Sequence, residues 1–269
     1  MTISTLDKQI SAPPVRFRSP SPVTWFLALI FGVLFIQGLM QAGITPARLW
    51  RGIFNLGRFF AMALPPDFSK LDVMAYAMLE TLNMAVVGVV FGVILSLPFA
   101  LLASTNTSPH PVVRSVARFM IATMRTIPDL IWALIFVVAV GLGPLAGILA
   151  LVVDTIGFCA RFFSERIEEV KPGPSEALIS TGASRMAVIL GAVVPEAFAS
   201  MTATSLFSIE RAIRSAVTLG LVGAGGIGVE LSTAMRLFNF DEAAAIILII
   251  LVVVIGFEQL SSMIRKRLI

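Results

Sequence analysis

The sequence predicts an all-α membrane protein with about six transmembrane helices, and three observations support this fold class. Of its 269 residues, 57% are hydrophobic and 13% are charged, whereas about 25% of residues are charged in soluble domains. The mean hydropathy of +0.94 is too high for a soluble globule with a polar surface. Several apolar runs also reach the length of about 20 residues that a membrane-spanning helix requires.

The basic balance of the chain does not indicate nucleic-acid binding. The formal net charge is +4 and the sequence pI is about 9.8, a balance that in a membrane protein usually reflects basic cytosolic loops. We therefore expect membrane lipid around the chain and no nucleic-acid partner. The lone Cys159 and the lone His110 leave no disulfide framework and no metal-ligand cluster, so we expect no metal site and no cofactor in this chain.

Residues 1–22 are expected to form a cytosolic N-terminal tail, and residues 23–72 a first span with an outer segment. The span runs from Val23 to Gln41. Basic residues precede it, as they would in a signal peptide, but no small-x-small cleavage site follows, which favours a retained anchor.

The outer segment contains an amphipathic stretch between residues 46 and 60. Its arginines fall within one narrow arc of a 3.6-residue helix, and apolar residues supply the remaining surface: Arg48, Arg51 and Arg58 against Leu49, Trp50, Ile53, Phe54, Phe59 and Phe60. Such a helix is suited to the headgroup plane of a membrane. A docking surface for a soluble partner is the alternative.

The remaining five spans lie in the core domain, residues 73–269. They are expected at Tyr76–Ala103, Phe119–Val140, Pro144–Phe163, Glu196–Leu221 and Glu242–Met263. The sequence Gly141-Leu-Gly-Pro144 separates the third span from the fourth, because glycine tolerates left-handed backbone and proline starts a new helix. With six spans both termini lie on one side, and the basic residues at both ends of the chain assign that side to the cytosol.

Ionisable residues in the fifth span are candidates for an aqueous pathway. Glu210 and Arg214 share one helix face in the favourable acid-first order, and Arg211 lies between them. Charged groups at membrane depth are costly and usually functional. An arginine fork suits transient guidance of an oxyanion, whereas a structural ion pair between helices is the other interpretation.

Other polar positions in the spans are also candidates. Arg125 lies where the third span opens with Arg125-Thr-Ile-Pro-Asp129. Pro128 can kink the helix there, and Asp129 can pair with Arg125. A structural cap with a kink and a role in gating are both compatible with this pattern. Asn83 is a lone polar residue on the second span, where hydrogen bonding between helices is the commoner role. Asp154 is isolated in the fourth span.

The glycines at 223, 225, 226 and 228 match the pattern GxGxxG, but a nucleotide site would need a βαβ unit around them. A membrane span precedes the pattern instead. Gly223, Gly225, Gly226 and Gly228 are therefore expected to form a tight connecting or re-entrant turn, because non-helical backbone at membrane depth must be buried or face water. The alternative to a purely structural turn is a hinge beside the pathway.

The segment EALISTGASRMAVILGAVVP, residues 176–195, resembles the EAA loop of ABC-importer permeases. The residues in register are Glu176, Ala177, Gly182 and Pro195, with Ala183 after the glycine, whereas Leu178, Ala192 and Val194 depart from the commonest residues but stay apolar. The resemblance implies a cytosolic loop at about residues 165–195. In it, a short helix around residues 176–187 fits a groove on the ATPase subunit and couples ATP hydrolysis to transport.

Three longer stretches, which begin at Arg125, Ile167 and Arg214, resemble the phosphonate ABC-importer permeases over roughly residues 70–269. This resemblance implies the type I importer (MetI-like) permease fold and a non-catalytic subunit of the bacterial inner membrane. It also implies a second permease subunit (a homodimer by default), two ATP-binding subunits that use the ATP, and an extracytoplasmic substrate-binding protein. The expected substrates are phosphonates or phosphate- and phosphite-like oxyanions.

Three other functions are the alternatives. One is an ABC-importer permease for a different small solute. A secondary transporter would favour internal inverted repeats, and none is evident in the sequence. A membrane enzyme would need a convergent set of catalytic groups, which one histidine, one cysteine and no HExxH or GxSxG pattern make improbable.

Overall fold

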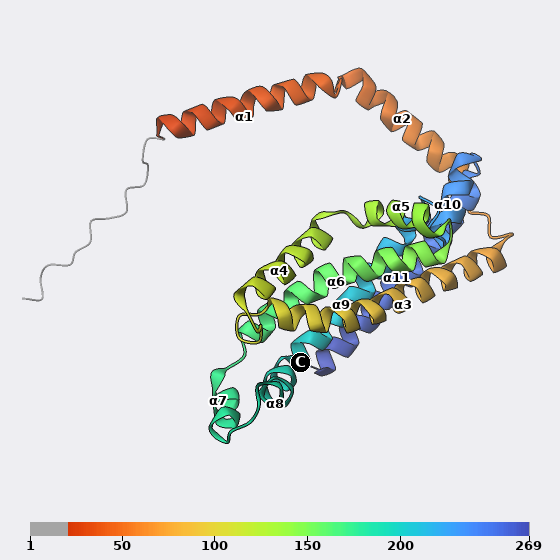
Figure 1. The fold of residues 1–269 in the computed structure, drawn as a ribbon. Helices are drawn as coiled ribbons and strands as arrows, with labels where there is room; N and C mark the ends of the chain where they lie inside the picture. The colour runs from red at the N-terminus through yellow and green to blue at the C-terminus, as the bar shows by residue number, and fades with distance from the viewer. Residues whose placement is uncertain (1–20, 269) are drawn as a thin grey trace, which may run out of the picture. The chain divides into compact units, whose positions relative to one another are not determined.

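The computed structural model describes residues 21–268, and over that range every regular element is a helix (Figure 1). The expected tail therefore lies almost entirely outside the described residues. The elements are α1 (Pro22–Gln41), α2 (Pro46–Ala63), α3 (Leu71–Ala103), α4 (Pro111–Thr126), α5 (Asp129–Val140), α6 (Pro144–Glu168), α7 (Pro172–Ser180), α8 (Arg185–Val188), the π-helical turn η1 (Ile189–Val193), α9 (Val194–Gly220), α10 (Ile227–Arg236) and α11 (Phe240–Leu268). The chain divides into two compact units, the first ending at Arg58 and the second beginning at Phe59.

In the first unit, α1 is apolar on all sides and has no buried residue, as expected for a helix surrounded by lipid. The predicted helix in the outer segment is present as α2. Its arginine side chains bond to nearby backbone: Arg51 Nε donates to the Ala47 carbonyl at 3.2 Å, and Arg48 Nη1 donates to the Gly43 carbonyl at 3.2 Å. Its place in the headgroup plane stays a prediction.

Five helices are long and apolar enough to cross a membrane, and the bent pair α4–α5 gives up to six spans. This confirms the fold class. The predicted separation of α5 from α6 is also confirmed, because Gly141 and Gly143 have φ of 94° and 129°, in the left-handed region that glycine tolerates.

The third predicted span, Phe119–Val140, was wrong as a single helix. The chain bends by 92° between α4 and α5. Pro128 is the cause, since a proline disfavours helical backbone in the residue before it, and Ile127 has an extended ψ of 121°. The helix before the break also starts earlier than predicted, at Pro111.

The core of the second unit forms where α3 and α6 approach closely. Gly88 lies against Leu151, and a side-chain carbon added at Gly88 would come within 2.7 Å of the Leu151 Cβ. Gly92 lies in the same way against Thr155. Small residues of this kind let helix backbones pack closely in a membrane, where van der Waals packing rather than the hydrophobic effect stabilises helix association.

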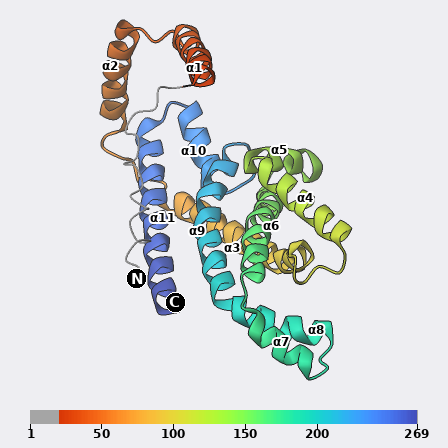
Figure 2. The same cartoon turned by 90° about the vertical axis from the view of Figure 1, so that its left-hand side faces the viewer.

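The coupling segment and the glycine-rich segment lie at opposite ends of the second unit. Figure 2 shows α7 and α8 at one end, the same end as the C-terminal end of α11, and α10 at the other. At the α10 end, Lys70 Nζ donates to Glu242 at 3.0 Å and 3.1 Å. This contact raises the pKa of Lys70, chiefly through the hydrogen bond to Glu242 and then through the charge of that carboxylate.

Candidate functional site

The predicted coupling loop folds as two short helices, α7 and α8, joined by a turn. Gly182 occupies the turn with φ of +80°, which a residue with a Cβ adopts only with strain. Its N–H donates to the Ile179 carbonyl at 3.0 Å, and the next N–H donates to the Leu178 carbonyl at 3.2 Å. Ser184 caps α8 by accepting the Ala187 N–H at 3.3 Å. The short helix expected around residues 176–187 is thus divided at Gly182, in agreement with the expectation that this glycine forms a turn between two short helices.

The predicted coupling residues are accessible at this end of the molecule. Glu176, Ala177 and Gly182 are exposed, Ala183 is half-buried, and Pro195 is exposed in the first turn of α9. A groove of about 800 Å³ lies between the two short helices and the loop after α3. Their role in coupling stays a prediction.

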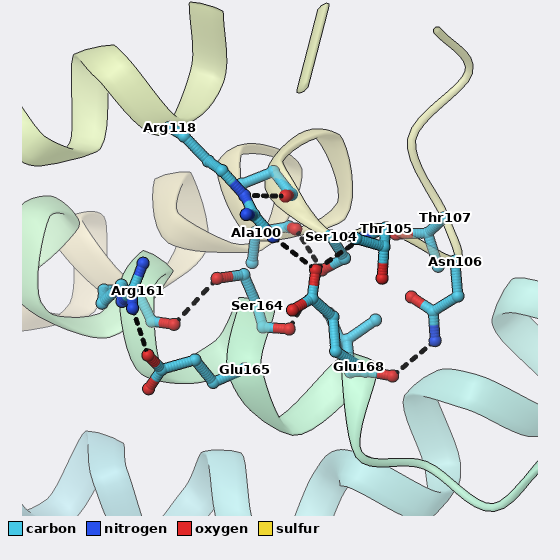
Figure 3. Close-up of polar contacts among 12 residues, drawn as sticks. Ala100, Ser104, Thr105, Asn106, Thr107, Arg118, Arg161, Ser164, Glu165 and Glu168 are labelled. Atoms are coloured by element: carbon cyan, nitrogen blue, oxygen red, sulfur yellow. Dashed lines mark hydrogen bonds and ion pairs between the residues drawn. The ribbon is translucent and has the colours of Figure 1, made fainter. Parts of the chain in front are cut away.

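A polar network fixes the loop after α3 to the end of α6 (Figure 3). Glu168 accepts the Thr105 N–H at 2.6 Å and pairs with Arg118 Nη2 at 2.5 Å. Asn106 Nδ2 donates to the Ile167 carbonyl at 2.6 Å, and Ser104 Oγ donates to the Ser164 carbonyl at 3.2 Å. The Glu168 carboxylate of α6 therefore connects α4 with the loop that joins α3 to α4.

Arg185 extends this network to the coupling segment. Its Nη2 donates to the carbonyl of Thr107 at 3.1 Å and to the carbonyl of Ser108. Since Arg185 is the first residue of α8, a displacement of α8 acts directly on the loop that joins α3 to α4.

A second polar group connects α6, α9 and α11. The predicted pair of Glu210 with Arg214 is present at 2.9 Å, and Arg265 of α11 also approaches Glu210, at 3.6 Å. Arg211 pairs with Asp154 of α6, and its guanidinium carbon lies 4.4 Å from the ring centroid of Phe158. We call these five ionisable residues the charged core: Asp154, Glu210, Arg211, Arg214 and Arg265.

The charged core is buried on its acidic side and open on its basic side. The Glu210 side chain is 8% exposed, whereas that of Arg214 is 44% exposed. An arginine at membrane depth avoids lipid contact. The exposed part of Arg214 is therefore best satisfied by water or by another protein chain.

The glycine-rich segment forms the predicted connecting turn, between α9 and α10. Gly223, Gly225 and Gly226 have positive φ, and two residues of α3 hold the end of the turn. Glu80 Oε1 accepts the Gly226 N–H at 2.9 Å, and Thr81 Oγ1 accepts the Ile227 N–H at 2.8 Å.

Gly228 lies outside this turn. It is a helical residue of α10, and a side-chain carbon added there would come within 2.9 Å of the Gly220 Cα. A hinge role for the four glycines stays a prediction.

The two remaining pathway candidates have different surroundings from those expected. Arg125 does not pair with Asp129, whose carboxylate instead accepts the Leu130 N–H at 2.9 Å; the Arg125 guanidinium carbon lies 5.9 Å from the centroid of the Phe162 ring. Asn83 is exposed on the surface of α3, so the expected bond to another helix does not occur within the described chain.

Sequence reasoning missed the partners that come from distant segments. Asp154 and Arg211 are opposite charges in two separate spans, and their pairing was open to inference because each lacks a partner on its own helix. Glu80 directly precedes Thr81 on α3, but no local pattern links either residue to a turn far along the chain. Arg265 entered the sequence prediction only as one of the basic residues near the C-terminus that indicate the cytosolic side.

The long apolar helices define a multi-pass integral membrane protein. The family described as "Binding-protein-dependent transport system inner membrane component" matches residues 72–269. The chain belongs to this family, and it is a multi-pass inner-membrane component of such a transport system.

Two curated relatives are similar over most of this chain. The phosphite transport system permease protein PtxC of Stutzerimonas stutzeri is 37% identical over 241 residues, which cover 90% of this chain and 88% of the relative. The phosphate-import permease protein PhnE of Mycolicibacterium smegmatis is 39% identical over 227 residues, which cover 84% of this chain. The chain spans less than half of this second relative, 43% of its length.

The fold also matches a solved structure. A chain of the MetNI methionine ABC transporter, solved in inward-facing conformations, superposes with a TM-score of 0.66 at 20% sequence identity. The match covers 76% of this chain and 99% of the other. The described core is therefore the MetI-like permease fold.

Proposed function

We propose that the chain is the transmembrane permease of an ATP-binding-cassette importer for phosphonates or for phosphate- and phosphite-like oxyanions. The observation that carries this proposal is the 37% identity with a phosphite permease over 88% of that protein's length. The arginines of the charged core are consistent with an anionic substrate, because a guanidinium fork matches the oxygens of a phosphate-like group.

The proposed assembly contains a second permease subunit, identical to this one, two ATP-binding subunits and an extracytoplasmic substrate-binding protein. This chain is non-catalytic and holds no cofactor; ATP is hydrolysed by the partner subunits. The α7–α8 end and both termini lie in the cytosol, and the α10 end faces the binding protein. The exposed positions of Glu176 and Ala177 leave both residues accessible to an ATP-binding subunit.

In the proposed mechanism, closure of the ATP-binding subunits displaces α7 and α8. Arg185 passes the displacement to the loop after α3, and Glu168 passes it on to α4 and α6. Alternating access then results from two packings of the same helices, biased by nucleotide and by the binding protein. Glu176, Ala177, Gly182, Ala183 and Pro195 form the coupling surface.

Uptake by the reconstituted importer tests the proposal. The chain is co-expressed with its ATP-binding subunit and its binding protein, and proteoliposomes are supplied with methylphosphonate, phosphite, phosphate or methionine. ATP-dependent accumulation of one of the three phosphorus compounds, absent without the ATP-binding subunit, is the expected result. Accumulation of methionine alone would instead assign the chain to a different solute, and accumulation without any ATP-binding subunit would assign it to secondary transport.

A further inference from the structure

A cavity of about 360 Å³ lies between α4 and α6, apart from the charged core. Three arginines line it, Arg118 and Arg125 from α4 and Arg161 from α6, together with the hydroxyl residues Thr126 and Ser164.

The sequence places these arginines on one wall for simple geometric reasons. Arg118 and Arg125 are two helical turns apart, so they share a face of α4. Gly157 of α6 lets the α4 backbone come close, since a side-chain carbon added at Gly157 would lie 3.0 Å from the backbone nitrogen of Arg125. The charged face of α4 is thereby held against α6.

The positive charges of the cavity are only partly balanced. Arg118 pairs with Glu168 at 2.5 Å, and Arg161 pairs with Glu165 at 2.6 Å. Arg125 has no carboxylate within ion-pair distance among the described side chains; its nearest special contact is the Phe162 ring. Three cations therefore face two carboxylates, which leaves one net positive charge.

The cavity also retains unused hydrogen-bond donors. Each guanidinium carries five N–H groups. Arg118 uses Nε for the Ala103 carbonyl at 2.8 Å and Nη2 for Glu168, and Arg161 uses Nη2 for Glu165. The Arg125 donors make no hydrogen bond within the described chain. Converging donors and an excess positive charge are what a tetrahedral oxyanion requires.

The position of Arg125 within the spans favours a polar or anionic partner over lipid. Arg125 is exposed, yet it lies beside Gly157, near the middle of the α6 span. An arginine at this depth that meets only lipid is strongly disfavoured.

We propose that the cavity binds a phosphate-type oxyanion through Arg118, Arg125 and Arg161. Two sources supply this chemistry, a free phosphonate or phosphate and the phosphate of an anionic phospholipid. In the first case the site is a stage of the import pathway on the α7–α8 side of the charged core, and that version rests on the proposed function.

Direct binding to the full chain tests the site. The protein is delipidated in dodecyl maltoside micelles, which contain no phosphate, and radioactive inorganic phosphate is measured by equilibrium dialysis with methylphosphonate as competitor. In a parallel arm, native mass spectrometry counts the phosphatidylglycerol that the protein retains. The variants are Arg125→Gln, Arg125→Lys and the matched control Arg114→Gln, which removes an arginine of the same helix that does not line the cavity.

The expected result is saturable phosphate binding that Arg125→Gln weakens about tenfold, the effect of losing one contact to a charged group. Arg125→Lys should weaken it less, and Arg114→Gln should leave it unchanged. Arg125-dependent retention of phosphatidylglycerol without phosphate binding also supports the site and makes the lipid its ligand. Absence of both, or an equal loss in Arg114→Gln, overturns the site. Size-exclusion profiles identify any variant that fails to fold, and the lysine variant keeps the test decisive.

Failure of the site is distinguishable from failure of the proposed function. If the wild-type importer accumulates phosphonate or phosphite and Arg125→Gln binds and transports equally well, only the site is wrong. If the wild-type importer moves no phosphorus compound but phosphate or phosphatidylglycerol binding depends on Arg125, only the proposed function is wrong.

Discussion

Glu210 is the residue on which the charged core depends most. It is a nearly buried carboxylate that faces two arginines, Arg214 at 2.9 Å and Arg265 at 3.6 Å. Removing one member of such a group leaves an uncompensated charge in a poorly solvated place, whereas removing an acid and a base together does not. The arrangement allows a structural role to be separated from a role in transport.

Neutralising Glu210 and Arg214 singly and together makes this separation. Glu210→Gln alone should lower the free energy of unfolding by about 1–2 kcal/mol, because the two arginines lose their counter-charge but stay partly exposed to solvent. The double variant Glu210→Gln, Arg214→Gln should recover folded protein but not uptake. Folded yield by size exclusion and uptake by proteoliposomes are the two measurements, and Arg236→Gln, at the exposed end of α10, is the control. Recovery of both folding and uptake would mean that the pair is purely structural.

Thr81 offers a simpler test of how the glycine-rich turn is held. Its hydroxyl is fully buried and accepts the Ile227 N–H. Thr81→Val keeps the shape but leaves that N–H unsatisfied, which should lower the free energy of unfolding by about 1–3 kcal/mol. Thr123→Val removes an exposed hydroxyl from α4 and should change stability by less than about 0.5 kcal/mol. Equal melting temperatures for the two variants would show that the α3 contact does not support the turn.

At the scale of elements, the turn between α7 and α8 depends on one glycine. Gly182→Pro both removes an N–H donor and demands a φ near −65° where the chain has +80°. We expect normal membrane insertion, loss of uptake and weaker co-purification with the ATP-binding subunit. Gly173→Ala changes a glycine of α7 that has open space around it and no positive φ, so it should behave as wild type. Normal uptake by well-expressed Gly182→Pro would remove the coupling role from this loop.

The elements show which parts of the structure were accessible from sequence. Breaks made by local chemistry were predicted at Gly141–Pro144 and at residues 223–226, because glycine and proline act on their own backbone. The bend at Ile127 was seen only as a possible kink, since its angle depends on how α4 packs against α6. Glu80, Asp154 and Arg265 gained partners that no helical periodicity encodes, because those partners lie in other helices.

For the whole molecule, the proposed orientation places the α7–α8 end in the cytosol. Cysteine labelling in a Cys159→Ser background tests it, and serine suits that buried site because the thiol already lies 3.0 Å from the Ser208 hydroxyl. An impermeant reagent added outside intact cells should label Arg236→Cys and leave Glu176→Cys unlabelled; both positions are exposed. The reverse pattern would invert the topology.

The π-helical turn Ile189–Val193 contains one residue more than a continuous α-helix would have between α8 and α9. If that turn tightened to α geometry, the surplus residue would rotate α8 by about 100° around the axis of α9 and advance it by about 1.5 Å. The predicted coupling helix α8 is thus joined to α9 through a turn whose length and rotation can change together. Deleting the exposed Leu190 would remove the extra residue of the π-helical turn while keeping the relative orientation of α8 and α9. A deletion variant that still binds its ATPase but no longer transports would indicate that rotation of α8 about α9 is part of the transport cycle.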